Sequence, residues 1–339
     1  MNAYIKAVEY FLPETVLTNE MLASQFSDWS SEKIAVKTGI KTRHISDKDV
    51  CASDLGIKAA KKIFDSGVIA VNEIDFLLFC SESPDYILPP SACLIQDKLG
   101  ISTSAGAFDF NLGCSGFVYG LGMAYSLISS LQAKNVLLIT AETYSKYLHH
   151  QDKSVRSIFG DGAAATLISS CESGVNNKIG PFVYGTDGSG YKNLIVPFGG
   201  ARNPRVTESS IIVEDQHGSA RSQENLYMNG PEIFNFTIKT VPVAVKNLLG
   251  KSNKSLEDVD HFVFHQANAY ILNHLRKKIG IPDDKFYVNL QDCGNTVSAS
   301  IPIAFKMALD ERKISSGDLV MIVGFGVGYS WAAALLEWI

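Results

Sequence analysis

The sequence has no long apolar run. No stretch approaches the ~18 consecutive apolar residues that a membrane-spanning helix needs, so we expect no membrane span. The chain also opens without the charged and then apolar leader that directs secretion. Together these absences predict a cytoplasmic protein.

Closely spaced cysteine pairs are absent as well. The cysteines are scattered, and none belongs to a CxxC motif. Because close ligand pairs mark most zinc sites, the sequence predicts no metal. Free thiols in a reducing compartment are the expected state. The six cysteines are Cys51, Cys80, Cys93, Cys114, Cys171 and Cys293.

An excess of basic charge is the third absence. The formal net charge is −5, so the chain has no global basic face for neutralising phosphates, which excludes a general nucleic-acid binder. Of the 339 residues, 46% are hydrophobic. That fraction can fill the core of one large domain or of two intimately packed ones.

What the sequence does contain is an internal repeat. The outer members of the repeat are short apolar runs that predict buried strands, and the middle member joins a strand to a tight turn. The separation of Asp75 from Cys114 is close to that of Asp260 from Asn295. Any α/β protein contains single apolar runs, but three pairs of similar segments in the same order are harder to obtain by chance. The paired segments are residues 75–80 with 260–265, 108–116 with 287–295, and 135–140 with 318–323.

The repeat predicts an α/β fold of two similar halves, residues 1–174 and 175–339. Strands that alternate with helices indicate βαβ units and parallel sheets. We expect the halves to pack together with helices between two sheets. Equivalent loops would then meet across a pseudo-twofold axis and bring Cys114, His265 and Asn295 together.

Cys114 is the candidate nucleophile. It lies between a predicted strand and an apolar segment, residues 117–128, of helical length. At a helix N-terminus, unpaired N–H groups and the helix dipole favour thiolate over thiol, so we expect a lowered thiol pKa. Gly113 and Gly116 remove side chains beside the sulfur. The alternative is that Cys114 is a small buried hydrophobe, as most single cysteines are.

A histidine and an asparagine follow the equivalent strands of the second half. His265 opens the motif of residues 265–268, and Asn295 belongs to residues 294–300. Alone, a core histidine and a turn-forming asparagine are the ordinary interpretations. Taken with Cys114, these motifs resemble the β-ketoacyl-acyl carrier protein synthase III family of the thiolase superfamily. The resemblance continues through residues 12–13, 37–40, 159–163, 187–190, 227–230 and 324–331.

The resemblance implies a thiolase-like fold, with duplicated βαβ halves in five αβαβα layers, and a decarboxylative condensation. Cys114 would carry the acyl group, while His265 and Asn295 act on a malonyl thioester. Loss of CO₂ creates an enolate oxygen, which a neutral imidazole N–H and an amide N–H can stabilise. The backbone N–H of Cys114, with one from Gly326 or Val327, would hold the second oxyanion. A plain strand-end turn is the alternative for that glycine-rich run. No cofactor is implied beyond the thioester substrates.

The sequence departs from the family where many relatives bind acetyl-CoA. Lys33 and Lys37 stand where a tryptophan and an arginine commonly sandwich the adenine, and Lys153 replaces another arginine that contacts the nucleotide. Lysine neither stacks nor bridges as guanidinium does. The acyl donor, CoA or carrier protein, therefore stays open. Phe325 and Asn268 are further candidates for substrate binding.

The resemblance also implies partners. Leu88 would lie at the interface of a homodimer, where it closes the neighbouring subunit's acyl tunnel. An acyl carrier protein would deliver the malonyl group. Tyr270 stands where the family has a basic docking residue, but Arg276, Lys277 and Lys278 follow on the same predicted helix. A solvated helix face is the alternative for these three.

Two other functions compete with condensation. The same acyl-Cys114 could pass its acyl group to an oxygen or nitrogen nucleophile, as in an acyltransferase or a hydrolase. A non-catalytic partner subunit of a condensing heterodimer is the other class. Asn295 favours condensation, because simple acyl transfer has no enolate to stabilise, and an intact Cys114 opposes the silent subunit. A degradative thiolase would need a second catalytic cysteine, for which Cys293 is the weak candidate.

Overall fold

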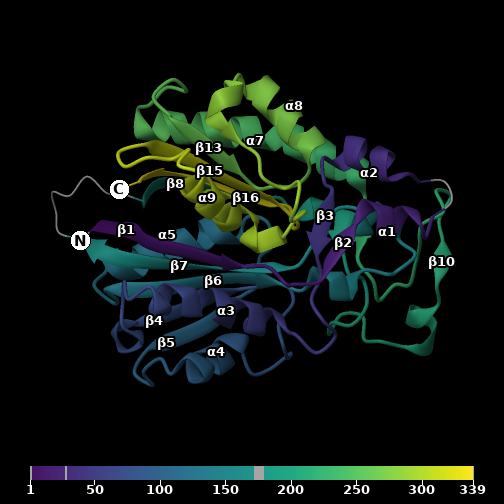
Figure 1. Ribbon diagram of the computed structural model, residues 1–339, viewed down its shortest axis with the longest axis horizontal. Helices are drawn as coiled ribbons and strands as arrows, with labels where there is room; N and C mark the ends of the chain where they lie inside the picture. The colour runs from purple at the N-terminus through teal and green to yellow at the C-terminus, as the bar shows by residue number, and fades with distance from the viewer. Residues whose placement is uncertain (1, 27–28, 172–178, 339) are drawn as a thin grey trace.

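A computed structural model describes residues 2–26, 29–171 and 179–338 of the chain. Two five-stranded mixed sheets lie face to face, with helices between them and over both outer faces (Figure 1). The boundary predicted between residues 174 and 175 falls outside the described residues. No helix in the described ranges is long and apolar enough to cross a bilayer.

The first sheet contains the strands of the N-terminal half. Its order is β1 (Asn2–Phe11), β7 (Gly162–Cys171), β6 (Asn135–Glu142), β4 (Phe76–Cys80) and β5 (Gly106–Phe110). Strand β4 pairs in parallel with both β5 and β6, whereas β7 pairs antiparallel with β6 and β1.

The second sheet repeats this plan. Its order is β14 (Phe286–Tyr287), β13 (His261–Phe264), β15 (Leu319–Gly326), β16 (Ser330–Glu337) and β8 (Ile179–Thr186). Strand β13 pairs in parallel with β14 and β15, and β16 pairs antiparallel with β15 and β8. The predicted duplication is therefore confirmed strand by strand, with β4 equivalent to β13 and β6 equivalent to β15.

Helices complete the layers. The apolar helix α5 (Gly116–Ser129) contacts strands of both sheets, and α9 (Ser300–Asp310) lies beside it against β1, β7 and β13. Helices α3 (Ala52–Asp65) and α4 (Ser91–Leu99) cover the outer face of the first sheet. Helices α7 (Gly230–Ser252) and α8 (Ala269–Ile279) lie over the second sheet in Figure 1. The five αβαβα layers expected from the resemblance are confirmed.

Shorter elements gather at one end of the layers, where α1, α2, β2, β3 and β10 lie together in Figure 1. These elements are β2 (Val16–Thr18), α1 (Asn19–Ala23), α2 (Ser31–Thr38), β3 (Thr42–His44), α6 (Lys153–Arg156), β9 (Leu194–Ile195), β10 (Val213–Glu214), β11 (Ala220–Arg221) and β12 (Tyr227–Met228). Among them, α2, α6, β9, β11 and β12 contribute residues to the lining of the cavity described below.

The helix layer between the sheets leaves little spare volume. Gly120 in α5 faces β6, and a Cβ atom there would lie 2.6 Å from the Leu138 side chain. Gly250, near the end of α7, has open space around the same position. The first glycine is required by packing, because an interior at crystal-like density cannot absorb an added methyl group without a shift.

We expect Gly120→Ala to lower the free energy of unfolding by about 1–3 kcal/mol through overpacking. The matched Gly250→Ala should be neutral or stabilising by up to about 1 kcal/mol, because alanine has the higher helix propensity. Denaturant unfolding of both variants measures the difference. Equal stabilities would contradict the tight α5–β6 packing.

Candidate active site

Cys114 lies in the turn between β5 and α5, with Ser115 at the N-cap of the helix. The turn is pressed against the end of β15 from the other half. A Cβ atom at Gly326 would lie 2.8 Å from the Cys114 sulfur, and one at Gly324 would lie 2.7 Å from the Cys114 carbonyl oxygen. Glycine is needed at both positions because a side chain there would collide with the Cys114 turn of the other half.

The thiol of Cys114 is buried, and its pKa is not lowered as expected. Burial raises that pKa well above its ordinary value, and the nearby carboxyl groups of Glu82 and Glu142 raise it further. The backbone N–H groups of Cys114 and Val327 act in the opposite direction. The expectation of a stabilised thiolate was wrong. A sequence can indicate that a cysteine lies at the start of a helix, but it does not show how deeply the thiol is buried or which carboxyl groups from other segments lie near it.

The same two N–H groups are the candidate oxyanion donors. Both lower the thiol pKa, so both act on the sulfur directly. The oxyanion hole expected at Cys114 with Gly326 or Val327 stays a prediction, which backbone donors at this place would suit. The glycine-rich run is also a strand end, since β15 extends to Gly326.

Asn295 is held by its backbone at the end of the loop that precedes α9. Its N–H donates to the Ile158 carbonyl at 2.9 Å, and its carbonyl accepts from Gly160 at 3.0 Å. Its side-chain Oδ1 accepts from the N–H of Val297 at 2.9 Å. The side-chain Nδ2 therefore points the other way, to within 3.5 Å of the His265 Nε2.

His265 follows β13 directly. Burial lowers the pKa of its imidazole to about 3, so the ring is neutral at physiological pH. The Ser300 hydroxyl lies 2.7 Å from Nδ1 and also accepts from the N–H of Gln266 at 3.4 Å. If the Ser300 hydroxyl donates to Nδ1, the ring proton lies on Nε2 beside Asn295, and this tautomer is the one used in the function proposed below. The sequence motif contained Ser300, but nothing in it indicated a contact with His265.

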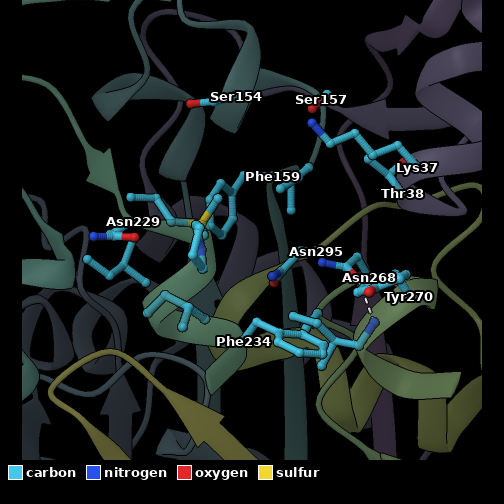
Figure 2. Close-up of a pocket in the computed structure, with 18 of the residues that line it drawn as sticks. Lys37, Thr38, Ser154, Ser157, Phe159, Asn229, Phe234, Asn268, Tyr270 and Asn295 are labelled. Atoms are coloured by element: carbon cyan, nitrogen blue, oxygen red, sulfur yellow. Dashed lines mark hydrogen bonds between the residues drawn. The ribbon is translucent and has the colours of Figure 1, made fainter. Parts of the chain in front are cut away.

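One cavity of about 1300 Å³ contains Cys114, His265 and Asn295 and opens at α2 and α8. Figure 2 shows Phe159 and Asn295 facing its centre, with Lys37 and Tyr270 toward the rim. The convergence that the repeat suggested for the three site residues is observed.

Four other residues expected to contact the substrate lie in the wall of this cavity. Lys37, Lys153, Phe325 and Asn268 all line the cavity. Lys33 is exposed on α2 and is not part of the lining.

Trp29 is a rim residue that the sequence interpretation missed. It lines the cavity, and the Lys37 amine lies over its ring, 5.5 Å from the centroid. Trp29 thus supplies the aromatic surface that is missing at Lys33. A tryptophan four residues before the aligned one could have been considered, but only the path of the chain shows that it reaches the rim.

The basic residues of α8 lie at its far end. Arg276 forms an ion pair with Asp283 at 3.1 Å, and Arg276, Lys277 and Lys278 occupy the last turn, where cations stabilise the helix dipole. Asn268 and Tyr270, at the other end of α8, line the cavity. The three basic residues therefore do not form part of its rim.

Two carboxyl groups close to Cys114 were also missed, those of Glu82 and Glu142. Burial raises the pKa of both, and repulsion by Glu82 adds to the rise at Glu142. The acidic end of the apolar strand β6 was the available signal, since a carboxyl group ending a buried run requires partners. In the described ranges no cluster of His, Cys, Asp and Glu could hold a metal ion.

The duplicated fold and the buried Cys–His–Asn site define a condensing enzyme of the thiolase class. Residues 108–188 match the 3-oxoacyl-[acyl-carrier-protein (ACP)] synthase III family, and residues 249–338 match its C-terminal region. The chain belongs to the β-ketoacyl-acyl carrier protein synthase III family.

Individual relatives agree over the full length. The chain is 37% identical to the β-ketoacyl-[acyl-carrier-protein] synthase III of Caldanaerobacter subterraneus, over 97% of this chain and 95% of that one. It is 38% identical to the enzyme of the same name from Clostridium perfringens, over 99% of each. A solved 3-oxoacyl-(acyl-carrier-protein) synthase III superposes with a TM-score of 0.98 at 47% identity, with each chain fully covered.

A neutral His265 makes the decarboxylation step independent of histidine titration. We expect the rate of CO₂ release from a malonyl thioester to be flat through pH 6.5, the ordinary histidine value, because the imidazole takes up a proton only near its lowered pKa of about 3. A radiometric or coupled CO₂ assay across this range measures the profile. A rate that changes tenfold per pH unit around 6.5 would contradict the assigned neutral form.

Proposed function

We propose that this enzyme joins an acyl group held on Cys114 to malonyl-acyl carrier protein, giving a 3-oxoacyl-acyl carrier protein and CO₂, and so acts as an acyltransferase. The observation that carries the proposal is the pair of neutral donors, His265 Nε2–H and Asn295 Nδ2–H, whose nitrogens lie 3.5 Å apart in the cavity of Cys114. Two convergent neutral donors suit an enolate oxygen.

The first half-reaction transfers the acyl group. The Cys114 sulfur attacks the thioester carbonyl, the oxyanion rests on the N–H groups of Cys114 and Val327, and the donor leaves as a free thiol that takes up the proton lost by Cys114. The high pKa of Cys114 requires that ionisation accompany substrate binding.

The second half-reaction forms the carbon–carbon bond. The malonyl carboxylate leaves as CO₂, and its electron pair moves onto the thioester as an enolate held by His265 and Asn295. The α-carbon then attacks acyl-Cys114, the carbon–sulfur bond breaks, and the Cys114 thiolate is reprotonated. Simple acyl transfer or hydrolysis would leave the paired donors without a role, and a non-catalytic subunit would leave the whole cavity without one.

The donor thioester is proposed to enter past the rim formed by Trp29 and Lys37. An aromatic face with a cation above it can contact either a nucleotide or the pantetheine arm, so CoA and carrier-protein donors both fit. No other cofactor is proposed. The carrier protein would dock over α8, with Lys277 and Lys278 attracting its acidic surface. Function in the cytoplasm and in fatty-acid initiation or a related specialised pathway completes the proposal.

A homodimer is proposed as the working unit. Strand β5 is an edge of its sheet among the described strands and leads directly to Cys114. The adjacent loop exposes Ile87 by 96% and Leu88 by 78%. Exposed apolar side chains beside an unpaired edge indicate an interface. A second copy would cover both features, and its Leu88 would close this subunit's acyl site.

Separate half-reactions test the function. Cys114→Ala should give no acyl adduct in an intact-mass measurement after incubation with acyl-CoA or acyl-carrier protein. Asn295→Ala should keep acylation while CO₂ release and condensation fall by about 10²-fold, since one oxyanion donor is lost. Asn72→Ala is the control, because Asn72 is exposed just before β4, at the end of that strand remote from the site. An adduct on Cys114→Ala, or equal loss of both half-reactions in Asn295→Ala, would refute the roles proposed.

Sedimentation equilibrium tests the dimer. We expect the wild type to be a dimer and Leu88→Asp to dissociate at least tenfold more readily, because an unpaired carboxylate would be buried at the interface. Val243→Asp, another exposed apolar position but on α7 in the opposite outer layer, should leave assembly unchanged. A fully active wild-type monomer at assay concentration would reject the interface.

A further inference from the structure

Two carboxyl groups lie behind the nucleophile and have no part in the mechanism above. Glu142 is the last residue of β6 and is fully buried. Glu82 lies two residues beyond the end of β4 and is partly exposed. A buried carboxyl group must be paired, hydrogen-bonded or protonated, because an isolated charge in the interior is costly.

The hydrogen bonds distinguish the two groups. Glu142 accepts from the hydroxyls of Ser83 and Ser298, each at 2.8 Å, and from the N–H of Glu82 at 3.1 Å and 3.2 Å. Donors on both oxygens suit an ionised carboxylate. Glu82 accepts one bond, from the Tyr144 hydroxyl at 2.6 Å. The group with fewer donors is the one that suits protonation.

Glu82 packs directly behind the nucleophile. A Cβ atom at Gly113, the residue before Cys114, would lie 2.5 Å from the Glu82 Oε2. Its partner Tyr144 belongs to the same apolar cluster as Cys114 and Phe159. A negative charge on Glu82 therefore opposes ionisation of the Cys114 thiol.

No ion pair in the described ranges neutralises the two acids. The groups whose pKa values they raise are themselves acidic, namely Cys80, Cys114, Tyr144 and Tyr147. Arg205 also acts on Tyr147, but it forms an ion pair with Glu224 at 3.4 Å, and His265 beside Cys114 is neutral. Two negative charges at this place would repel each other and any thiolate on Cys114. A single proton retained by the pair removes one of them.

We propose that Glu82 and Glu142 together hold one proton and that this proton makes Cys114 reactive. While Glu82 is protonated, only Glu142 opposes thiolate formation. When Glu82 loses its proton, the second charge suppresses the thiolate. Both glutamates are positioning residues in this proposal, because they act through Cys114. The proposal rests on Cys114 being the nucleophile but not on the identity of the acyl donor.

The proposal predicts a particular pH profile. The fraction of Cys114 present as thiolate should rise tenfold per pH unit at first. It should then rise less steeply, in a segment that we call the plateau, over the range in which Glu82 deprotonates, because the added charge raises the thiol pKa. At higher pH it should rise steeply again. A group that merely supports the fold would not introduce such a plateau.

The test is the rate of alkylation of Cys114 by iodoacetamide from about pH 5 to pH 10, followed by mass spectrometry of the Cys114 peptide. Glu82→Gln keeps an oxygen that accepts from Tyr144 but cannot gain charge. It should abolish the plateau and raise the alkylation rate above it by about tenfold, the effect of one pKa unit on the thiolate fraction. Asp109→Asn, which removes another partly buried carboxyl, on the strand β5, should keep the wild-type profile.

Tyr144→Phe provides an independent variant should Glu82→Gln fold poorly. Loss of the hydroxyl that stabilises charged Glu82 should move the plateau to higher pH. A protonated-carboxyl infrared band at neutral pH, present in the wild type and absent from Glu82→Gln, would support the same proton. A smooth wild-type profile, a plateau that survives Glu82→Gln, or no shift in Tyr144→Phe would overturn the proposal. Absence of acylation at Cys114 would instead refute the proposed function.

Discussion

The contact between the Cys114 turn and the end of β15 is the constraint on which the site depends. Side-chain-free positions at Gly324 and Gly326 let two halves of the chain meet with the sulfur between them. This approach brings the N–H of Val327 close enough to lower the thiol pKa, as the N–H of Cys114 does. Duplication of the fold therefore supplies the two proposed oxyanion donors from two different halves.

The polar groups of the Cys–His–Asn site carry no formal charge. His265 is neutral because it is buried, Asn295 and Ser300 are neutral by nature, and the Cys114 thiol is kept protonated by its surroundings. Such a neutral site suits a reaction whose intermediates are anions. No negatively charged group among the described residues occupies the hydrogen-bond donors beforehand, so they are available when the enolate oxygen forms. Within it, the Glu82–Glu142 pair is the exception, and its proton limits the negative charge near the nucleophile.

The strands and their duplication were readable from the sequence to a large extent, but the order in which they pair was not. The runs that begin at Asp75 and Asp260 became β4 and β13, each an interior strand of its sheet. Buried strands demand contiguous apolar residues, so a duplicated sheet leaves a duplicated pattern. The rim could not be read in this way. Trp29 and Lys37 meet at the cavity, whereas the family resemblance pointed to Lys33 instead.

The sequence by itself determined which groups are the candidates for catalysis. Cys114, His265 and Asn295 were identifiable because each occurs in a characteristic local motif after a predicted strand, and the chemistry of a thiol, an imidazole and an amide belongs to the residue itself. Only the tertiary structure decided their surroundings. The raised thiol pKa, the contact of His265 with Ser300 and the proton proposed for Glu82 all depend on burial and on neighbours distant in sequence. Those electrostatic conditions arise from the packing of the two halves and leave no local pattern in the chain.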